Sequence, residues 1–190
     1  MGWFWGDEIR PMGYRVIYAD PPWLFRNRSA KGEGKNATRH YRCMPIDEIR
    51  AMPVRDLAAG DCVLYLWTTW PFLEQAFDVV NAWGFTYKSG GAWRKLSPTG
   101  KHEAFGPGYI ERNACDPYLI ATIGEPKRYH RAIRNVISAP VREHSRKPDE
   151  MRERLELLLD GPYLELFSRS NRPGWTAWGD QVGLFDEVAP

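Results

Sequence analysis

The sequence is poor in cysteine and has no long apolar run. Its 190 residues include three cysteines, Cys43, Cys62 and Cys115, which are far apart and form no CxxC pair. Such a set argues against a disulfide scaffold and against structural zinc, and it fits a reducing, cytoplasmic environment. Because no uninterrupted stretch of about 18 apolar residues occurs, a membrane span is not expected. The first residues also lack the basic and apolar regions of a secretory signal.

The chain also lacks internal repeats, low-complexity tracts and a large excess of charge of one sign. It has 26 Lys and Arg against 24 Asp and Glu, a net charge of +2. Locally, residues 26–42 carry six basic residues against one acid, and residues 88–102 carry four against none. These segments are compatible with contacts to a polyanion or with ordinary solvated loops. We expect one domain over residues 1–190, with mobile loops at about 26–42 and 95–107.

The apolar pattern predicts strands that alternate with helices. Continuous apolar runs indicate buried strands, and helical spacing of apolar residues indicates helices over 72–83 and 148–159. Strands are predicted over residues 15–20, 62–67, 85–89, 91–94, 118–123, 135–138, 163–167 and 176–178, and a short helix over 45–52. This order favours an α/β fold with helices on both faces of a mostly parallel sheet. Ligands of such sheets bind beyond the carboxyl ends of the strands.

The strongest local signal is Asp20-Pro21-Pro22-Trp23, which follows the first predicted strand. The prolines fix φ and keep their carbonyl acceptors, while the Asp20 carboxylate can only accept hydrogen bonds. The Asp20 carboxylate and the Pro21 carbonyl can hold both hydrogens of an amino group, and Trp23 can stack on a base. This arrangement would orient the nitrogen toward an electrophile and stabilise its developing positive charge. The alternative is a strand-ending turn with a buried Trp.

The segment RVIYADPPW resembles the catalytic segment of N6-adenine methyltransferases that use S-adenosylmethionine. More narrowly, the chain resembles the family that contains the eukaryotic mRNA adenosine methyltransferase and many phage and bacterial adenine methyltransferases. The similar blocks are residues 15–23, 40–41 with 45–52, 62–67 with 72–83, 108–113, 146–150, 164–169, and 174–175 with 179–181, and the resemblance extends from about residue 14 to residue 181. The resemblance implies a circularly permuted Rossmann-like fold, with the Asp-Pro-Pro-Trp segment ahead of the cofactor-binding strand. It also fits the absence of GxGxxG, since S-adenosylmethionine has no pyrophosphate.

The resemblance implies which residues bind the cofactor. Lys147 would pair with the carboxylate of the cofactor, with a solvated lysine before a helix as the alternative. Glu165 lies in an apolar strand, where an unpaired charge is costly, so we expect Arg169 or cofactor hydroxyls as its partner. The other residues expected to contact the cofactor are Asp20, Phe167, Arg169, Asn171, Asp180 and Gln181.

Four residues, Asp20, Pro21, Pro22 and Trp23, are the expected catalytic residues, and no metal is required. Tyr41, Arg112 and Asn113 are expected near the target base, with Arg26 and Arg39 on the nucleic-acid backbone. The alternatives are a core tyrosine for Tyr41, and a salt bridge to Asp116 and a turn for Arg112 and Asn113. Asp116, where relatives often have Glu, is expected to order the loop.

These observations leave several functions open. The first is N6-adenine methylation of DNA, in which the adenine must leave the base stack to reach Asp20. The same chemistry on RNA is the second, and DNA is favoured because compact relatives resemble phage and bacterial DNA enzymes. A catalytically silent nucleic-acid-binding subunit and a nucleotide-binding module without transfer chemistry are the others. The sequence leaves the oligomeric state open, with a homodimer as one option. We expect a cytoplasmic protein that is either nucleoid-associated or phage-encoded.

Overall fold

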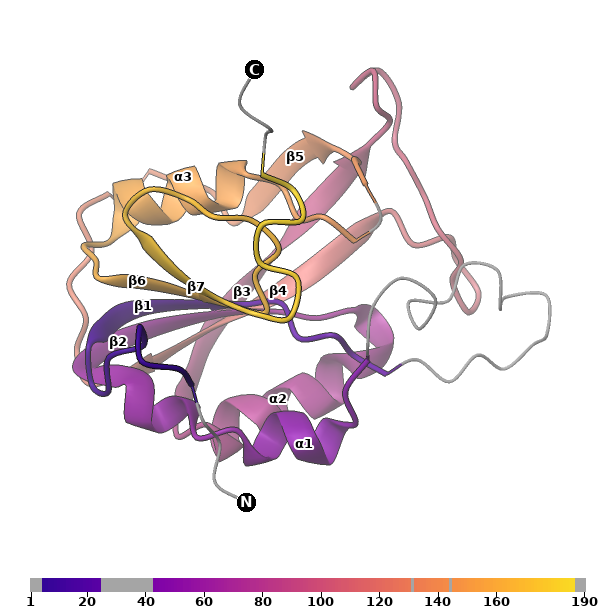
Figure 1. The fold of residues 1–190 in the computed structure, drawn as a ribbon. Coiled ribbons are helices and arrows are strands. Elements are labelled where there is room, and N and C mark those ends of the chain that lie inside the picture. Colours follow the sequence, from indigo (N-terminus) through magenta and orange to yellow (C-terminus); the bar gives the residue numbers. More distant parts are fainter. Residues whose placement is uncertain (1–4, 25–42, 131, 144, 187–190) are drawn as a thin grey trace.

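The fold is built on one mixed seven-stranded sheet in the order β5-β3-β4-β2-β1-β6-β7 (Figure 1). The computed structural model describes residues 5–24, 43–130, 132–143 and 145–186. The strands are β1 (Tyr14–Ala19), β2 (Ala58–Trp67), β3 (Thr86–Leu96), β4 (Cys115–Ile123), β5 (Val136–Pro140), β6 (Tyr163–Leu166) and β7 (Trp175–Trp178). The helices are α1 (Ile46–Ala51), α2 (Leu73–Ala82) and α3 (Glu150–Leu158), with short 3₁₀ helices η3 (Val54–Leu57) and η4 (Trp70–Phe72).

The sheet is mostly parallel, as the sequence predicts. β1 pairs in parallel with β2 and β6, β6 with β7, and β3 with β5. β4 is antiparallel to both of its neighbours, β2 and β3, so β3 and β5 again run in the direction of β1. Within this sheet β4 is therefore the one strand that runs against the others.

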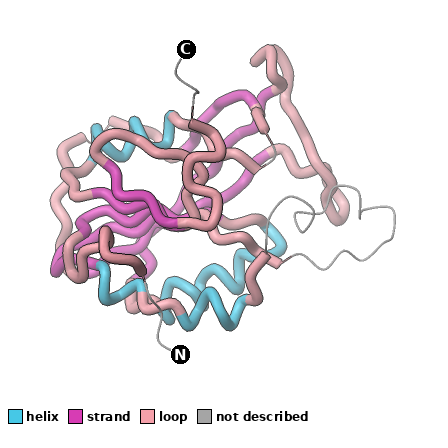
Figure 2. The backbone as a smooth tube through the Cα atoms, in the orientation of Figure 1, coloured by secondary structure: helices cyan, strands magenta, loops and turns pink. Residues whose placement is uncertain are grey.

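Helices cover both faces of the sheet, which confirms the predicted α/β layering (Figures 1 and 2). α1 and α2 bury Ile49 and Val79 in one core, which Ile17 of β1 also enters. On the other face, Leu155 of α3 packs in a second core that contains Val16. Neighbouring residues of β1 thus enter opposite cores, and both faces of the strand are dry. This double burial explains why the strands read as continuous apolar runs.

Three elements are longer than the sequence suggests. β2 and β4 each begin several residues earlier, and the two extended pieces predicted around residues 85–94 form the single strand β3. Gly90 and Gly91 lie inside β3, where a larger residue would clash. A Cβ on Gly90 would stand 2.6 Å from the Tyr118 carbonyl oxygen, and a Cβ on Gly91 would stand 2.1 Å from the Asn135 carbonyl oxygen. These glycines permit close backbone approach and do not interrupt the strand.

α2 ends at Ala82, next to the end of the helix predicted over residues 72–83. Gly84 adopts a φ of +76° directly after Trp83, the C-cap of α2. A left-handed residue at this place ends a helix, and glycine adopts it without the steric cost of a Cβ.

The carboxyl edge of the sheet gathers the predicted functional segments. Asp20 follows β1, Thr68 follows β2 and Phe167 follows β6, and these three strands are parallel neighbours. Because β4 runs in the opposite direction, its first residues lie at this same edge, where the Thr68 N–H donates to the Pro117 carbonyl at 3.0 Å. Segments separated by more than a hundred positions in the sequence therefore meet here. Among the described helices, none is long and apolar enough to cross a membrane.

The packing of α3 can be tested with two leucines of the same helix. Leu155 is fully buried, whereas Leu157 is 58% exposed. Leu155→Ala should lower the free energy of unfolding by about 2–5 kcal/mol, because it leaves a cavity in the second core. Leu157→Ala, the matched control, should change it by less than about 0.5 kcal/mol. Urea denaturation measures both, and equal effects would contradict the packing described.

Candidate active site

The Asp-Pro-Pro-Trp segment forms a turn at the end of β1, and backbone hydrogen bonds hold this turn in place. The Trp23 N–H donates to the Pro21 carbonyl at 2.8 Å, and the Met44 N–H donates to the Pro22 carbonyl at 2.9 Å. Trp23 and Met44 also form an isolated parallel β-bridge. Both proline carbonyls thus accept a hydrogen bond from the chain itself, and each oxygen keeps a second lone pair.

Trp23 packs into the protein interior, so the expectation that it stacks on a base is wrong. Trp23 is only 6% exposed, and its ring stacks on the Phe72 ring with the two centroids 5.7 Å apart. The indole N–H donates to the Trp67 carbonyl at 3.1 Å. A buried tryptophan that anchors the turn, the alternative considered from the sequence, is what the structure shows.

Asp20 and Lys147 are brought into direct contact. The Lys147 Nζ donates to the Asp20 Oδ2 at 2.9 Å, and the two side chains are 13% and 25% exposed. Nζ also lies 5.6 Å from the centroid of the Trp67 ring, a cation–π distance. Lys147, which is expected to pair with the carboxylate of the cofactor, therefore lies beside Asp20, which is expected to bind the amine. Two segments 127 positions apart form one site.

The partner of Glu165 is Arg152, and not Arg169 as considered from the sequence. The Arg152 Nη1 donates to the Glu165 Oε2 at 3.0 Å from α3 across to β6. Arg152 is 8% exposed, and a carboxylate in such surroundings needs a countercharge. Burial raises the pKa of Glu165 to about 7, although the Arg152 guanidinium acts in the opposite direction.

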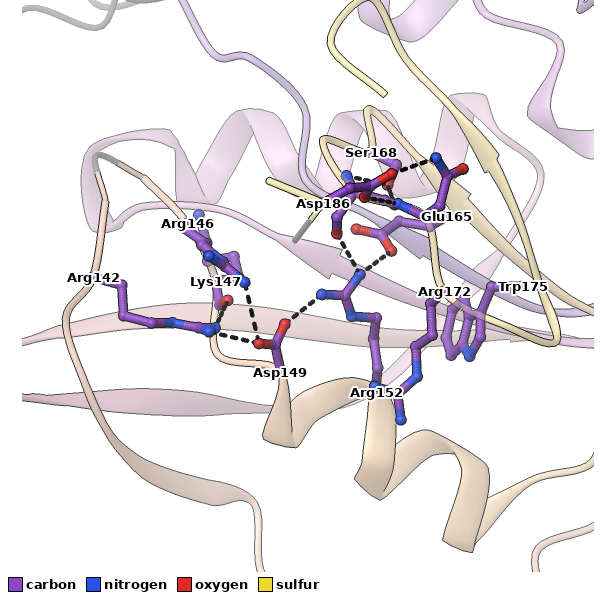
Figure 3. A network of polar contacts seen from close by, with 12 residues as sticks. Arg142, Arg146, Lys147, Asp149, Arg152, Glu165, Ser168, Arg172, Trp175 and Asp186 are labelled. Atoms are coloured by element: carbon purple, nitrogen blue, oxygen red, sulfur yellow. Dashed lines mark hydrogen bonds and ion pairs between the residues drawn. The ribbon is translucent and has the colours of Figure 1, made fainter. Parts of the chain in front are cut away.

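Arg152 is the centre of a wider network of charges (Figure 3). Its guanidinium also donates to the Ser170 Oγ at 2.9 Å and to the Asp149 carboxylate. Asp149 accepts further hydrogen bonds from Arg142 and Arg146. Burial opposes ionisation of Asp149, but the hydrogen bonds from Arg142 and Arg152 lower its pKa to about 2. The network joins the segment that carries Lys147 to the loop after β6.

The backbone after β6 takes an unusual conformation. Phe167 has a φ of +62°, which is rare outside glycine, and its ring packs edge-on against Trp178. The Ser168 N–H donates to the Trp178 carbonyl at 2.9 Å. Gly179 is required here, since a Cβ would lie 2.6 Å from the Ser168 carbonyl oxygen. Strained backbone at a sheet edge is typical of binding sites.

The remaining predicted cofactor residues lie on this loop and on the segment after β7. The Arg169 guanidinium lies 4.7 Å from the centroid of the Phe185 ring, and Asn171 binds Asp186. Asp180 is exposed, and the Gln181 carbonyl accepts a hydrogen bond from the Leu184 N–H at 3.0 Å. These residues follow β6 and β7, whose carboxyl ends are adjacent in the sheet.

Of the predicted substrate residues, the structure describes Arg112 and Asn113. Arg112 does not pair with Asp116 in the structure, and instead lies 5.9 Å from the centroid of the Phe105 ring. Asp116 pairs with Lys95 at 2.6 Å. Asn113 forms the turn considered from the sequence, since its Oδ1 accepts the Cys115 N–H at 3.2 Å. Tyr41, Arg26 and Arg39 lie outside the described residues.

Two site residues were missed by sequence reasoning. Tyr18 accepts a hydrogen bond from the Trp67 indole at 2.8 Å, and burial raises the pKa of its phenol well above its usual value. Arg152 did carry a signal, because it lies at helical spacing from Leu155 on the apolar face of α3. A charged residue on such a face indicates a buried partner.

The side chains at this edge suit a small zwitterionic ligand with hydroxyl groups. Lys147 and Arg169 are cations for a carboxylate, while Asp20 and Glu165 accept from an ammonium or from hydroxyls. Glu165 is buried and already accepts a hydrogen bond from Arg152, so it offers a ligand only the remaining acceptor positions of its carboxyl group. Among the described residues, no group of three or more His, Cys, Asp or Glu side chains is arranged to hold a metal ion.

Comparison with known proteins covers nearly the whole chain. The MT-A70 family model matches residues 14–181. The Type II methyltransferase M.MunI of a Mycoplasma species is 27% identical over 199 residues, which cover 93% of this chain and 82% of the relative. Human N(6)-adenine-specific methyltransferase METTL4 is 29% identical, with 92% of this chain and 39% of the relative covered. The N6-methyladenosine RNA methyltransferase MTA1 of Pyricularia oryzae is 32% identical, with 92% and 48% covered. The chain thus spans most of the first relative but less than half of the other two.

The raised pKa of Glu165 predicts a pH dependence of stability. Between about pH 4.3, the pKa of an unfolded Glu, and a folded value of about 7, the folded chain holds a proton that the unfolded chain has lost. The free energy of unfolding should therefore fall as pH rises through this window, on the order of 1–3 kcal/mol more in the wild type than in Glu165→Gln. Chemical denaturation at several pH values measures this, and parallel pH profiles of the two proteins would contradict the assignment.

Proposed function

We propose that this chain, which belongs to the MT-A70 family, transfers a methyl group from S-adenosylmethionine to the N6 amine of adenine in a nucleic acid. The observation that carries the proposal is the contact between Asp20 and Lys147 at 2.9 Å, at the edge where β1 and β6 both end. It supports an amine-binding carboxylate beside a cofactor-binding cation. The relatives METTL4 and MTA1, by their names, modify the same position of adenine.

Asp20 and Pro21 act on the substrate amine. The carboxylate of Asp20 and the second lone pair of the Pro21 carbonyl accept its two N–H groups, which turns the nitrogen lone pair away from them. The chain thereby orients a weak nucleophile and stabilises the positive charge that develops on nitrogen. Asp20 is not required as a strong base, because the methylated ammonium is acidic and releases its proton afterwards. The buried ring of Trp23 holds both acceptors in place.

Lys147, Glu165, Arg169 and Asn171 are the residues that would hold S-adenosylmethionine. Lys147 and Arg169 supply positive charge for its carboxylate, and Glu165 and Asn171 supply acceptors for its hydroxyls or its ammonium. When bound, the cofactor supplies a methyl carbon on a positively charged sulfur. The network around Arg152 keeps Glu165 and the loop after β6 in position.

DNA is the favoured substrate. Among the relatives compared above, the Type II methyltransferase M.MunI has the most similar length, and the chain covers 82% of it. The name of the MTA1 relative supports RNA as the second candidate. Whether the substrate is DNA or RNA, its target adenine must be unstacked, because the amine cannot reach Asp20 from within a duplex.

Some of the basic residues within residues 88–102, which the sequence offers for phosphate contacts, have acidic partners in the structure. Residues 88–96 belong to β3 and do not form a loop. Arg94 pairs with Glu103 at 3.0 Å and Lys95 with Asp116, so two of the four basic residues have acidic partners. Lys88 and Lys101 are exposed and remain candidates for the nucleic-acid backbone.

The substrate can be identified with tritiated S-adenosylmethionine and matched DNA and RNA oligonucleotides, each single- and double-stranded. Nucleoside analysis should find the label on N6-methyladenine, with more label in DNA than in RNA. Label on cytosine, or on the protein alone, would overturn the proposal. A catalytically silent subunit would bind little or no S-adenosylmethionine in a calorimetric titration.

Asp20→Asn tests the amine-binding carboxylate. The variant keeps the size of the side chain but replaces one acceptor by a donor, so label transfer should fall about 100-fold or more. Asp78→Asn, exposed on α2, is the matched control and should retain activity. Both variants are compared with the wild type in the tritium assay, with circular dichroism as the check of folding. Undiminished turnover by Asp20→Asn would refute the assigned role.

Lys147→Met tests the cation of the cofactor site. Loss of a charge-assisted hydrogen bond should raise the KM for S-adenosylmethionine by roughly 10-fold to 100-fold. Lys127→Met, at an exposed position after β4, should leave the KM unchanged. Steady-state assays at several cofactor concentrations make the measurement, and an unchanged KM in Lys147→Met would exclude this lysine from the cofactor site.

A further inference from the structure

The last described residues fold back onto the loop that follows β6. The Phe185 N–H donates to the Arg169 carbonyl at 2.9 Å, and the Asp186 N–H donates to the Gly183 carbonyl at 3.2 Å. Gly183 has a φ of +89°, which allows the chain to turn at this point. Residues 183–186, here called the C-terminal clasp, thus contact a loop that carries two of the residues assigned to cofactor binding.

Asp186 makes two hydrogen bonds to Asn171. Its Oδ1 accepts the Asn171 backbone N–H at 2.7 Å, and its Oδ2 accepts the Asn171 Nδ2 at 2.8 Å. These hydrogen bonds lower the pKa of the Asp186 carboxyl, so it is ionised at neutral pH. A carboxylate can only accept, and the amide of Asn171 must therefore turn its nitrogen toward Asp186. The Oδ1 of Asn171 consequently faces away from the clasp as an acceptor of fixed orientation.

Phe185 contributes a second contact between the clasp and the site. Its ring lies 4.7 Å from the Arg169 guanidinium and 5.0 Å from the Arg146 guanidinium. Arg146 directly precedes Lys147, so one aromatic ring contacts both segments that carry the cations of the site. Cation–π contacts of this kind restrain long arginine side chains that otherwise sample many rotamers.

We propose that Asp186 is a positioning residue for cofactor binding. It fixes the amide of Asn171 so that an oxygen, and not an NH₂ group, faces donor groups of S-adenosylmethionine such as its hydroxyls or its ammonium. The inference rests on the proposed function, since it takes Asn171 to contact this cofactor. It adds a residue outside the predicted set and assigns it a defined effect, the choice between two orientations of one amide.

An exchange of the two side chains provides the test. In Asp186→Asn, the new amide offers an NH₂ to residue 171, which favours the flipped amide of Asn171 and turns its own NH₂ toward the cofactor. In Asn171→Asp, two carboxylates face each other and repel. The double variant Asn171→Asp/Asp186→Asn restores both hydrogen bonds. The backbone N–H of residue 171 again donates to an oxygen of residue 186, the bond between the two side chains runs in the reverse direction, and residue 171 again presents an oxygen to the cofactor.

Calorimetric titration with S-adenosylmethionine and steady-state assays measure the effect. Each single variant should bind the cofactor about tenfold more weakly, with a raised KM and a kcat within about twofold of the wild type. The double variant should recover to within about threefold. Asn171 and Asp186 are both exposed, so the fold should persist, and thermal unfolding followed by circular dichroism confirms it. Asp78→Asn is again the control.

The outcomes separate the clasp from the proposed function. Wild-type affinity in both single variants, or a double variant no better than the single ones, overturns the positioning role. If the wild type binds S-adenosylmethionine but methylates no adenine, the proposed function alone is overturned. Calorimetry of the variants still tests the positioning role of Asp186 in that case. A wild type that binds no S-adenosylmethionine overturns both.

Discussion

The parallel pairing of β1 with β6 is the constraint on which the site depends. The two strands are far apart in the sequence, yet Ala19 lies opposite Leu166 in the sheet. The residues that follow them, Asp20 and Phe167, therefore leave the sheet side by side and in the same direction. In a parallel sheet the functional loops share one edge, and the helices that connect the strands stay on the faces. The acceptor end and the cofactor end of the site are joined by backbone hydrogen bonds.

Charges at this edge are balanced in pairs across different elements. Asp20 has Lys147, and Glu165 has Arg152. Breaking a pair of this kind by removing one partner is costly, because the other charge remains partly or wholly buried. The pairs therefore select one arrangement of the segments before α3 and after β6, and so they contribute more to the geometry of the site than to net stability.

Much of the fold follows from the sequence, because apolar runs and stop signals are local. The helix predicted over residues 72–83 and the end of the first strand before Asp20 are examples. The partner of Glu165 could not be read in this way, since hydrophobic spacing shows that a partner is needed but not which element supplies it. Gly90 was misread because its role is close approach to the Tyr118 carbonyl on another strand. The amide of Asn171 depends on Asp186, an exposed residue in a segment without periodic pattern.

The β-bridge between Trp23 and Met44 has a consequence for how this scaffold can diversify. It joins the two ends of the intervening stretch close to the Asp20 carboxylate, and the hydrogen bond from the buried Trp23 indole to Trp67 connects this closure to the core. Closing a longer stretch at such a base costs little, about 0.6 kcal/mol for each doubling of its length. Changes in the length of the chain between the two bridged positions should therefore leave the turn at Asp20–Trp23 in place.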